Sequence, residues 1–161
     1  MVDRLVVQSR IAKLREYLAL LKKIRGMADE RRFVSDPLVY GNAERYLQLA
    51  IQAVLDISNH IVADMNLGLP GDNTELFDLL AKRKVVSARL AKKLALMAGF
   101  RNILVHEYLD IDRRRVYHVL SQDLGDFERF IKAVSRLLQK PGRPVAMRFQ
   151  RARRFAHAPR R

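Results

Sequence analysis

Apolar residues recur three or four positions apart along most of the chain, a spacing that places them on one face of an α-helix. The first stripe consists of Val7, Ile11, Leu14, Leu18 and Leu21, and it predicts a helix over roughly residues 3–27. No segment alternates apolar and polar residues convincingly, and no Asn-Gly or Asp-Gly pair between apolar runs marks a hairpin. The pattern therefore predicts an all-α fold.

Helix start and stop signals divide the rest of this region. Asp36-Pro37 predicts the start of a second helix, because Asp can cap the first free amides and Pro fits the first helical position. We expect a short third helix from Thr74 to about Lys82, a fourth that begins at Ser87, and a last long helix from about Asp112 to Gln139. The prediction is an up-and-down bundle of about five helices over residues 1–140.

Positive charge is concentrated at the C-terminus. The chain has 31 Lys and Arg and 17 Asp and Glu among 161 residues, so its formal net charge is +14. Residues 140–161 hold eight of the cations and no acid, which leaves 23 − 17 = +6 for the other residues. Pro141-Gly142-Arg143-Pro144 stops any helix, so we expect a flexible Arg-rich tail over residues 141–161. Such a tail either tracks RNA or is only solvated.

Several classes of protein are excluded by what the sequence lacks. It has no Cys, so disulfides and thiolate metal sites are impossible. It has no apolar run of the ~18–20 residues that a membrane span needs, no Gly-rich phosphate loop, and no zinc-protease motif. We expect a cytoplasmic protein without metal or cofactor that does not contact membrane. Its basic character makes nucleic acid the first partner to consider.

One polar cluster interrupts the apolar pattern at the end of the fourth predicted helix. Arg101, Asn102, His106 and Tyr108 lie close together in the sequence there. Positions 101 and 106 diverge by about 140° around a continuous helix, so they converge only if the helix ends or bends or if a second copy supplies a group. On these grounds alone, the cluster is either catalytic or a structural helix terminus.

Other polar residues are weaker candidates. Asp56 and His60 are four positions apart on the second predicted helix and can pair. They either support the polar cluster and contact RNA, or form a local helix pair. The Arg113–Arg115 run either touches phosphate or is a solvated face, and we expect His118 to be solvated.

The stretch Arg101-Asn102-Ile103-Leu104-Val105-His106-Glu107-Tyr108 resembles the R-x4-H-x-Y motif of the HepT-like branch of the HEPN-domain family. The segments Glu44–Ala50 and Val54–Ile61 resemble the second helix of that family, and the likeness covers roughly residues 5–138. The basic tail lies outside it.

This resemblance implies a helical homodimer in which two copies of Arg101 and His106 line one composite cleft. The implied activity is metal-independent cleavage of RNA, either mRNA or tRNA, by the toxin of a prokaryotic toxin–antitoxin pair. His106 would act as general base or acid, Arg101 would stabilise the charged phosphorane, and Asn102 would orient groups or contact RNA. The implied antitoxin is MntA, a minimal nucleotidyltransferase that silences the toxin by AMPylating the motif tyrosine, here Tyr108.

Two other functions stay open. The bundle can be a non-catalytic helical partner or substrate-binding subunit of a nucleotidyltransferase, with Arg101 and His106 at the interface. It can also be a basic nucleic-acid-binding protein that performs no chemistry. Loss of RNA cleavage in Arg101→Ala and His106→Ala would favour the nuclease over both.

Overall fold

The computed structural model describes residues 3–106 and 111–139, and these residues form seven α-helices. The helices are α1 (Arg4–Met27), α2 (Glu30–Ser35), α3 (Pro37–Asp64), α4 (Asn73–Lys82), α5 (Ala88–His106), α6 (Arg113–Gln122) and α7 (Leu124–Gln139). The predicted all-α class is confirmed. None of the described helices is long and apolar enough to cross a membrane.

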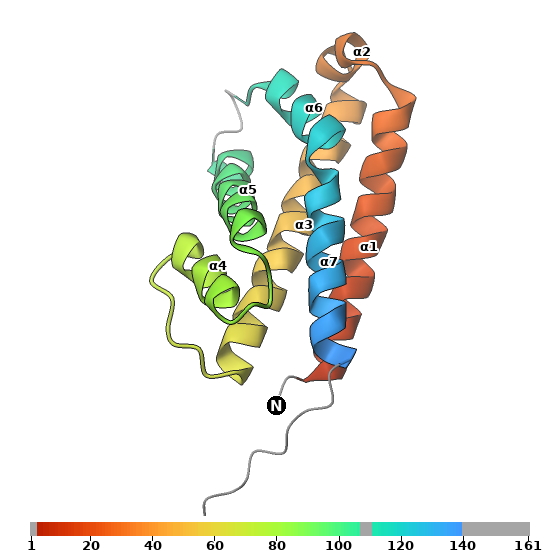
Figure 1. Ribbon diagram of the computed structural model, residues 1–161. Helices are drawn as coiled ribbons and strands as arrows, with labels where there is room; N and C mark the ends of the chain where they lie inside the picture. Colours follow the sequence, from red (N-terminus) through yellow and green to blue (C-terminus); the bar gives the residue numbers. More distant parts are fainter. Residues whose placement is uncertain (1–2, 107–110, 140–161) are drawn as a thin grey trace, which may run out of the picture.

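Helices α1 and α3 run side by side and form the most extensive packed pair of the bundle, and α7 packs against α1 and α5 (Figure 1). The predicted stripe Val7, Ile11, Leu14, Leu18 and Leu21 is buried, and it packs α1 against α3. Helices α4 and α5 pack together on α3, whereas α2 and α6 lie at the other end of the bundle from α4 (Figure 1). Helix α5 therefore runs from the α4 end of the bundle to the α2 and α6 end.

Aspartate side chains cap most of the helix starts. Asp36 accepts a hydrogen bond from the Leu38 amide and is followed by Pro37, as the sequence predicts for α3. The expected cap of α4 is wrong by two residues, because Asp72 rather than Thr74 accepts from the Glu75 amide. Glu75 in turn accepts a hydrogen bond from the Gly71 amide, so the two side chains bond to amides at the helix start in a way that resembles a capping box.

The predicted number of helices is too small, for two reasons. Helix α2 was missed because its six residues bury only Phe33, which gives no periodic signal. The predicted helix over 112–139 is two helices, joined at Asp123, whose amide donates to the Val119 carbonyl. Buried residues Val116, Leu120, Leu124 and Phe127 keep helical spacing across this join, so the spacing does not reveal the break.

Candidate active site

Helix α5 carries the polar cluster and is anchored by its apolar side chains. Seven of them are buried, namely Leu90, Ala91, Leu94, Met97, Ala98, Phe100 and Leu104. The Ser87 hydroxyl accepts a hydrogen bond from the Leu90 amide and starts the helix where the sequence predicts. The packed part of α5 thus fixes the position of its C-terminal turns, where Arg101 and Asn102 lie.

Residues 101–106 continue the helix without a break, and His106 is the last residue of α5. At about 100° and 1.5 Å per residue, positions 101 and 106 differ by about 140° around the axis and about 7.5 Å along it. Neither a bend nor an end of the helix brings the two positions onto one face. Within one copy of α5, the two positions therefore lie on different faces of the helix.

Arg101 keeps unused hydrogen-bonding capacity. Its side chain is half-buried, and one terminal nitrogen lies 3.4 Å from Asn102 Oδ1. Its Nε is buried and has no hydrogen-bond partner in the described part of the chain. A buried donor left unpaired costs ~1–3 kcal/mol, so such a group is a natural place for an acceptor from outside the chain. Asn102 is exposed beside it.

A hollow of about 290 Å³ lies between α5 and α6 and is lined by Phe100, the residue before Arg101. The Arg115 guanidinium lies 5.1 Å from the centroid of the Phe100 ring and lines this hollow with His118. His118 is exposed, as predicted. Asp123 and Asp126 line the same hollow, so it holds both signs of charge beside the Phe100 ring.

A second cluster joins the start of α6 to α3. The Arg113 guanidinium lies 4.1 Å from the centroid of the Tyr40 ring. Burial raises the pKa of the Glu44 carboxyl, and the charge of Arg113 opposes the shift only in part. Glu44 Oε1 and Arg113 Nε are both buried and have no hydrogen-bond partner within the described ranges. Sequence reasoning missed this cluster, because Tyr40 and Glu44 are far from Arg113 in the sequence.

The three arginines of the predicted run differ in their surroundings. Arg113 stacks on Tyr40, and Arg115 lies over Phe100. Arg114 is exposed and pairs with Glu30 at 3.7 Å. Arg114 and Arg115 are exposed and Arg113 is half-buried, so the run is partly solvated, and a contact with phosphate stays a prediction.

Asp56 and His60 do not pair with each other, contrary to the expectation from their spacing. Asp56 accepts hydrogen bonds from Arg10 on α1 at 2.7 Å and from Gln52 at 2.9 Å. His60 Nε2 lies 3.1 Å from Asp64 Oδ2, but without the alignment of a hydrogen bond. Asp56 therefore pairs with Arg10 on α1 and not with His60. A role for either residue in contacting RNA stays a prediction.

Tyr108 lies outside the described residues, as does the predicted tail over 141–161. In the part that the structure describes, no group of three or more His, Asp or Glu is placed to hold a metal ion.

A family profile described as ribonuclease HepT-like matches residues 14–134, which span α3, α5 and the polar cluster. The chain belongs to the HepT-like ribonuclease family. It is therefore a ribonuclease, and the predicted membership of this family is confirmed.

Two curated HepT proteins are similar to the chain along most of their length. The mRNA nuclease HepT of Shewanella oneidensis is 31% identical over 80% of this chain and 96% of that protein. The tRNA nuclease HepT of Aphanizomenon flos-aquae is 32% identical over 85% of this chain and 92% of that protein.

Solved HepT structures share the fold. One is a tri-AMPylated HEPN toxin of Shewanella oneidensis in complex with an MNT antitoxin. It is 31% identical, covers 84% of this chain and 99% of its own, and has a TM-score of 0.76. A toxin–antitoxin crystal structure with AMP-PNP covers 81% of this chain and 98% of its own, at 30% identity and a TM-score of 0.76.

Proposed function

We propose that this HepT-like ribonuclease is the toxin of a toxin–antitoxin pair and cleaves RNA without a metal ion. The observation that carries the proposal is Arg101, half-buried on α5 with an unpaired Nε, five residues before His106 in a matching family motif. The names of the relatives, an mRNA nuclease and a tRNA nuclease, support RNA as the substrate.

RNA supplies its own nucleophile in the proposed reaction. One His106 imidazole accepts the proton of the 2′-hydroxyl, whose oxygen attacks the adjacent phosphorus. The bond from phosphorus to the 5′-oxygen breaks, and a protonated His106 from the second subunit gives its proton to that oxygen. The products are a 2′,3′-cyclic phosphate and a 5′-hydroxyl.

Arg101 stabilises the additional negative charge that develops on the phosphorane oxygens. A guanidinium stays charged and can donate two hydrogen bonds to neighbouring oxygens. Removal of one such donor typically lowers kcat by ~10²–10³-fold. Asn102, exposed beside Arg101, contacts or orients the RNA.

The proposed composite cleft needs a homodimer through α5. Leu96 is 75% exposed on α5, and Gly99, about one turn later, has open space around it. A large exposed apolar side chain beside a glycine lets a second helix approach closely. Leu96→Asp should convert dimer to monomer in light scattering, whereas Leu69→Asp, at a residue 97% exposed outside α5, should not.

Cleavage in EDTA tests the chemistry. Wild type should produce 2′,3′-cyclic phosphate ends, and Arg101→Ala and His106→Ala should each lose at least about 100-fold in rate. Equal activity in all three proteins would refute the assignment. Binding without cleavage by wild type would instead favour a non-catalytic partner of a nucleotidyltransferase.

We also propose that a MntA-type nucleotidyltransferase silences the protein by AMPylating Tyr108. The structure of an AMPylated HEPN toxin with its MNT antitoxin supports this regulation. AMP on Tyr108 would bring bulk and negative charge next to the RNA site. Co-expression with the neighbouring nucleotidyltransferase should add whole AMP masses to wild type and none to Tyr108→Phe.

A further inference from the structure

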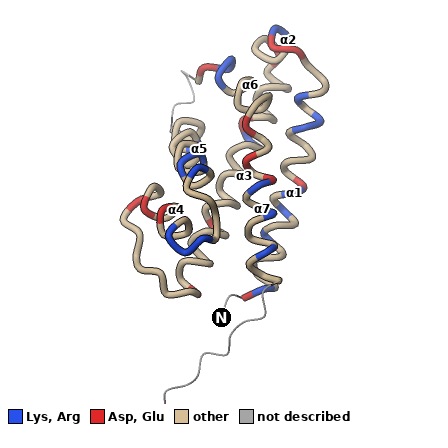
Figure 2. The backbone as a smooth tube through the Cα atoms, viewed as in Figure 1, with Lys and Arg blue, Asp and Glu red and all other residues tan. Residues whose placement is uncertain are grey.

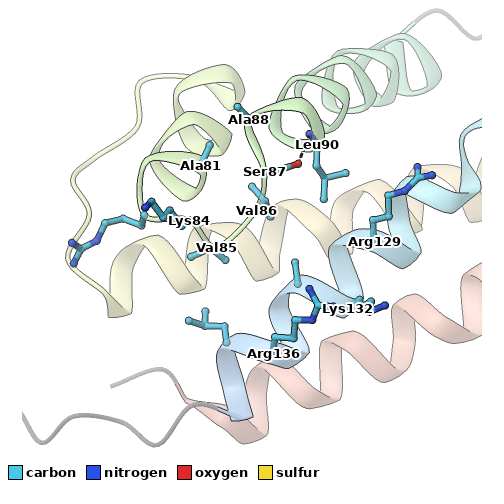
Figure 3. Close-up of a pocket in the computed structure, with 13 residues that line it drawn as sticks. Ala81, Lys84, Val85, Val86, Ser87, Ala88, Leu90, Arg129, Lys132 and Arg136 are labelled. Atoms are coloured by element: carbon cyan, nitrogen blue, oxygen red, sulfur yellow. Dashed lines mark hydrogen bonds between the residues drawn. The ribbon is translucent and has the colours of Figure 1, made fainter.

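A cleft of about 740 Å³ separates the turn after α4 from the C-terminal half of α7. Figure 3 shows Lys84, Val85 and Val86 on the turn, opposite Lys132 and Arg136 on α7. The volume lies within the ~300–1,000 Å³ of typical ligand sites. Ala88 and Leu90 at the start of α5 line the cleft, whereas Arg101 lies near the other end of that helix.

The cleft is lined by five cations and by no carboxylate, namely Arg83, Lys84, Arg129, Lys132 and Arg136. Arg129 pairs with Asp126. The other four form no ion pair with any residue in 3–106 or 111–139. Figure 2 shows Lys and Arg at this turn and along α7. Uncompensated cations that face one cleft repel each other, so an anionic ligand would be stabilised there.

Lys84 has an unusual backbone conformation for a lysine. It follows the last turn of α4 with φ of +57°, in the left-handed region that favours glycine. The amides of Lys84 and Val85 donate to the Ala81 and Leu80 carbonyls, which is the Schellman arrangement that ends a helix. Asn66 holds the equivalent position after α3, with φ of +50°, and Asn is a usual choice there. The chain thus places a cation where conformational preference favours Gly or Asn.

Two smaller hollows between the cleft and Phe100 share lining residues with their neighbours. Arg129 lines both the cleft and a hollow that adds Arg89 and Lys93. Lys93 also lines the hollow of Phe100 and Arg115. Asp123 and Asp126 lie 3.9 Å and 2.9 Å from Lys93, so these two hollows hold both signs of charge. Among the three, the cleft alone is lined by cations without a carboxylate.

We propose that this basic cleft binds the phosphate backbone of the substrate RNA at a distance from the scissile bond. The proposal rests on the proposed function, because it gives the ribonuclease site a second contact with its substrate. No aromatic side chain lines the cleft, so it holds phosphates and does not stack bases. Phosphate contacts carry no sequence information, so the cleft contributes affinity and leaves the choice of cleavage site to the motif end.

The length of α5 sets the size of RNA that can use both contacts. From Ala88 to Arg101 the helix rises about 20 Å. In a stacked strand, whose phosphates advance ~3.4 Å per nucleotide, about six nucleotides cover that distance, and an extended strand covers it in fewer. A dinucleotide has only the scissile phosphate, so it can occupy the motif end but cannot also reach the cleft.

Salt-dependent binding tests the cleft directly, in full-length protein that carries His106→Ala to prevent cleavage. The test variant is Lys132→Gln/Arg136→Gln. The control is Lys23→Gln/Arg31→Gln, which removes two exposed cations that lack an ion pair with any described residue and lie outside the cleft. Each lost phosphate contact lowers the slope of log K against log salt by about 0.7, which is about fivefold in affinity at 0.1 M salt relative to 1 M. We expect the test variant to bind a 20-nucleotide RNA about 25-fold more weakly and the control to match its parent.

Cleavage kinetics separate this proposal from the proposed function, with the same variants made in protein that keeps His106. The test variant should raise KM for the 20-nucleotide RNA with kcat unchanged, and should match wild type on a dinucleotide substrate. Equal KM values for test and control variants on the long RNA would overturn the cleft proposal while leaving the ribonuclease assignment intact. Loss of cleavage on both lengths would also overturn it, and so would unchanged RNA binding together with weakened binding of the antitoxin.

Discussion

Replacement of Lys84 by glycine should make the protein more stable and a poorer binder of RNA. The Lys84 backbone lies in the left-handed region at φ +57°, and its side chain is exposed. A left-handed L-residue costs roughly 1–2 kcal/mol, which glycine avoids. Against this gain, glycine lowers the free energy of unfolding by about 0.4–1 kcal/mol, because it gives the unfolded chain more conformational freedom. The mid-range difference is a gain of about 0.8 kcal/mol in the free energy of unfolding.

Urea denaturation followed by circular dichroism measures this gain, and the m-value should be unchanged. In a thermal melt, a gain of this size should raise Tm by roughly 2–3 °C for a domain of this length. Asn66→Gly is the matched control, because Asn66 has the same Schellman position at φ +50° but tolerates it better. Its stability should change less, and its RNA affinity should not change.

The two readouts together test the interpretation of Lys84. A fall in the stability of Lys84→Gly would refute the claim that its backbone is strained. A gain in stability without weaker RNA binding would refute the claim that the lysine is placed there to contact phosphate. Lys84→Asn is expected to lie between wild type and the glycine variant in stability, and to bind RNA as weakly as the glycine variant.

Three further predictions concern the motif, the Glu44 cluster and the core. Equal mixtures of wild-type and His106→Ala subunits should keep less than half of the wild-type cleavage in a fluorescent RNA assay, because a composite cleft needs His106 from both subunits. Burial raises the pKa of Glu44, so the wild-type fold loses stability as pH rises from below the unfolded pKa through the folded one. Urea melts should accordingly show Glu44→Gln more stable than wild type at pH 7, and the difference should shrink at pH 4. Phe33 is fully buried with its ring centroid 5.4 Å from that of Tyr117, so Phe33→Ala should cost ~3–5 kcal/mol in the same melts.

The long helices were predictable from sequence because each carries its own signals. The α1 stripe is buried as predicted, and the Asp36-Pro37 start of α3 is observed. Short elements carry too little periodic information, so α2 was not predicted. The break at Asp123 was not predicted either, since it lies in a stripe that continues in register on both sides.

Part of the candidate site could likewise be predicted from the sequence, and part could not. Motif residues Arg101 and Asn102 could be found from the sequence, because they lie together at the end of one helix. The Tyr40, Glu44 and Arg113 cluster and the basic cleft depend on the packing of distant segments, which spacing alone does not give. The Asp56–His60 pair failed because helical spacing only permits a pair, whereas Arg10 on α1 offers Asp56 a charged partner at 2.7 Å.

The two ends of α5 suit different tasks in handling RNA. The C-terminal end of a helix carries partial negative charge, which disfavours phosphate unless cations offset it. Arg101 on α5 and Arg115 on α6 lie at that end, so their positive charges offset the helix and can act on the phosphate that reacts. At the other end, no carboxylate lines the basic cleft, and four of its five cations form no ion pair within the described ranges. Binding energy gained there is the same in the ground state and the transition state, so it lowers KM without changing kcat. The length dependence of KM, with kcat constant, is therefore the kinetic signature of this separation along one helix.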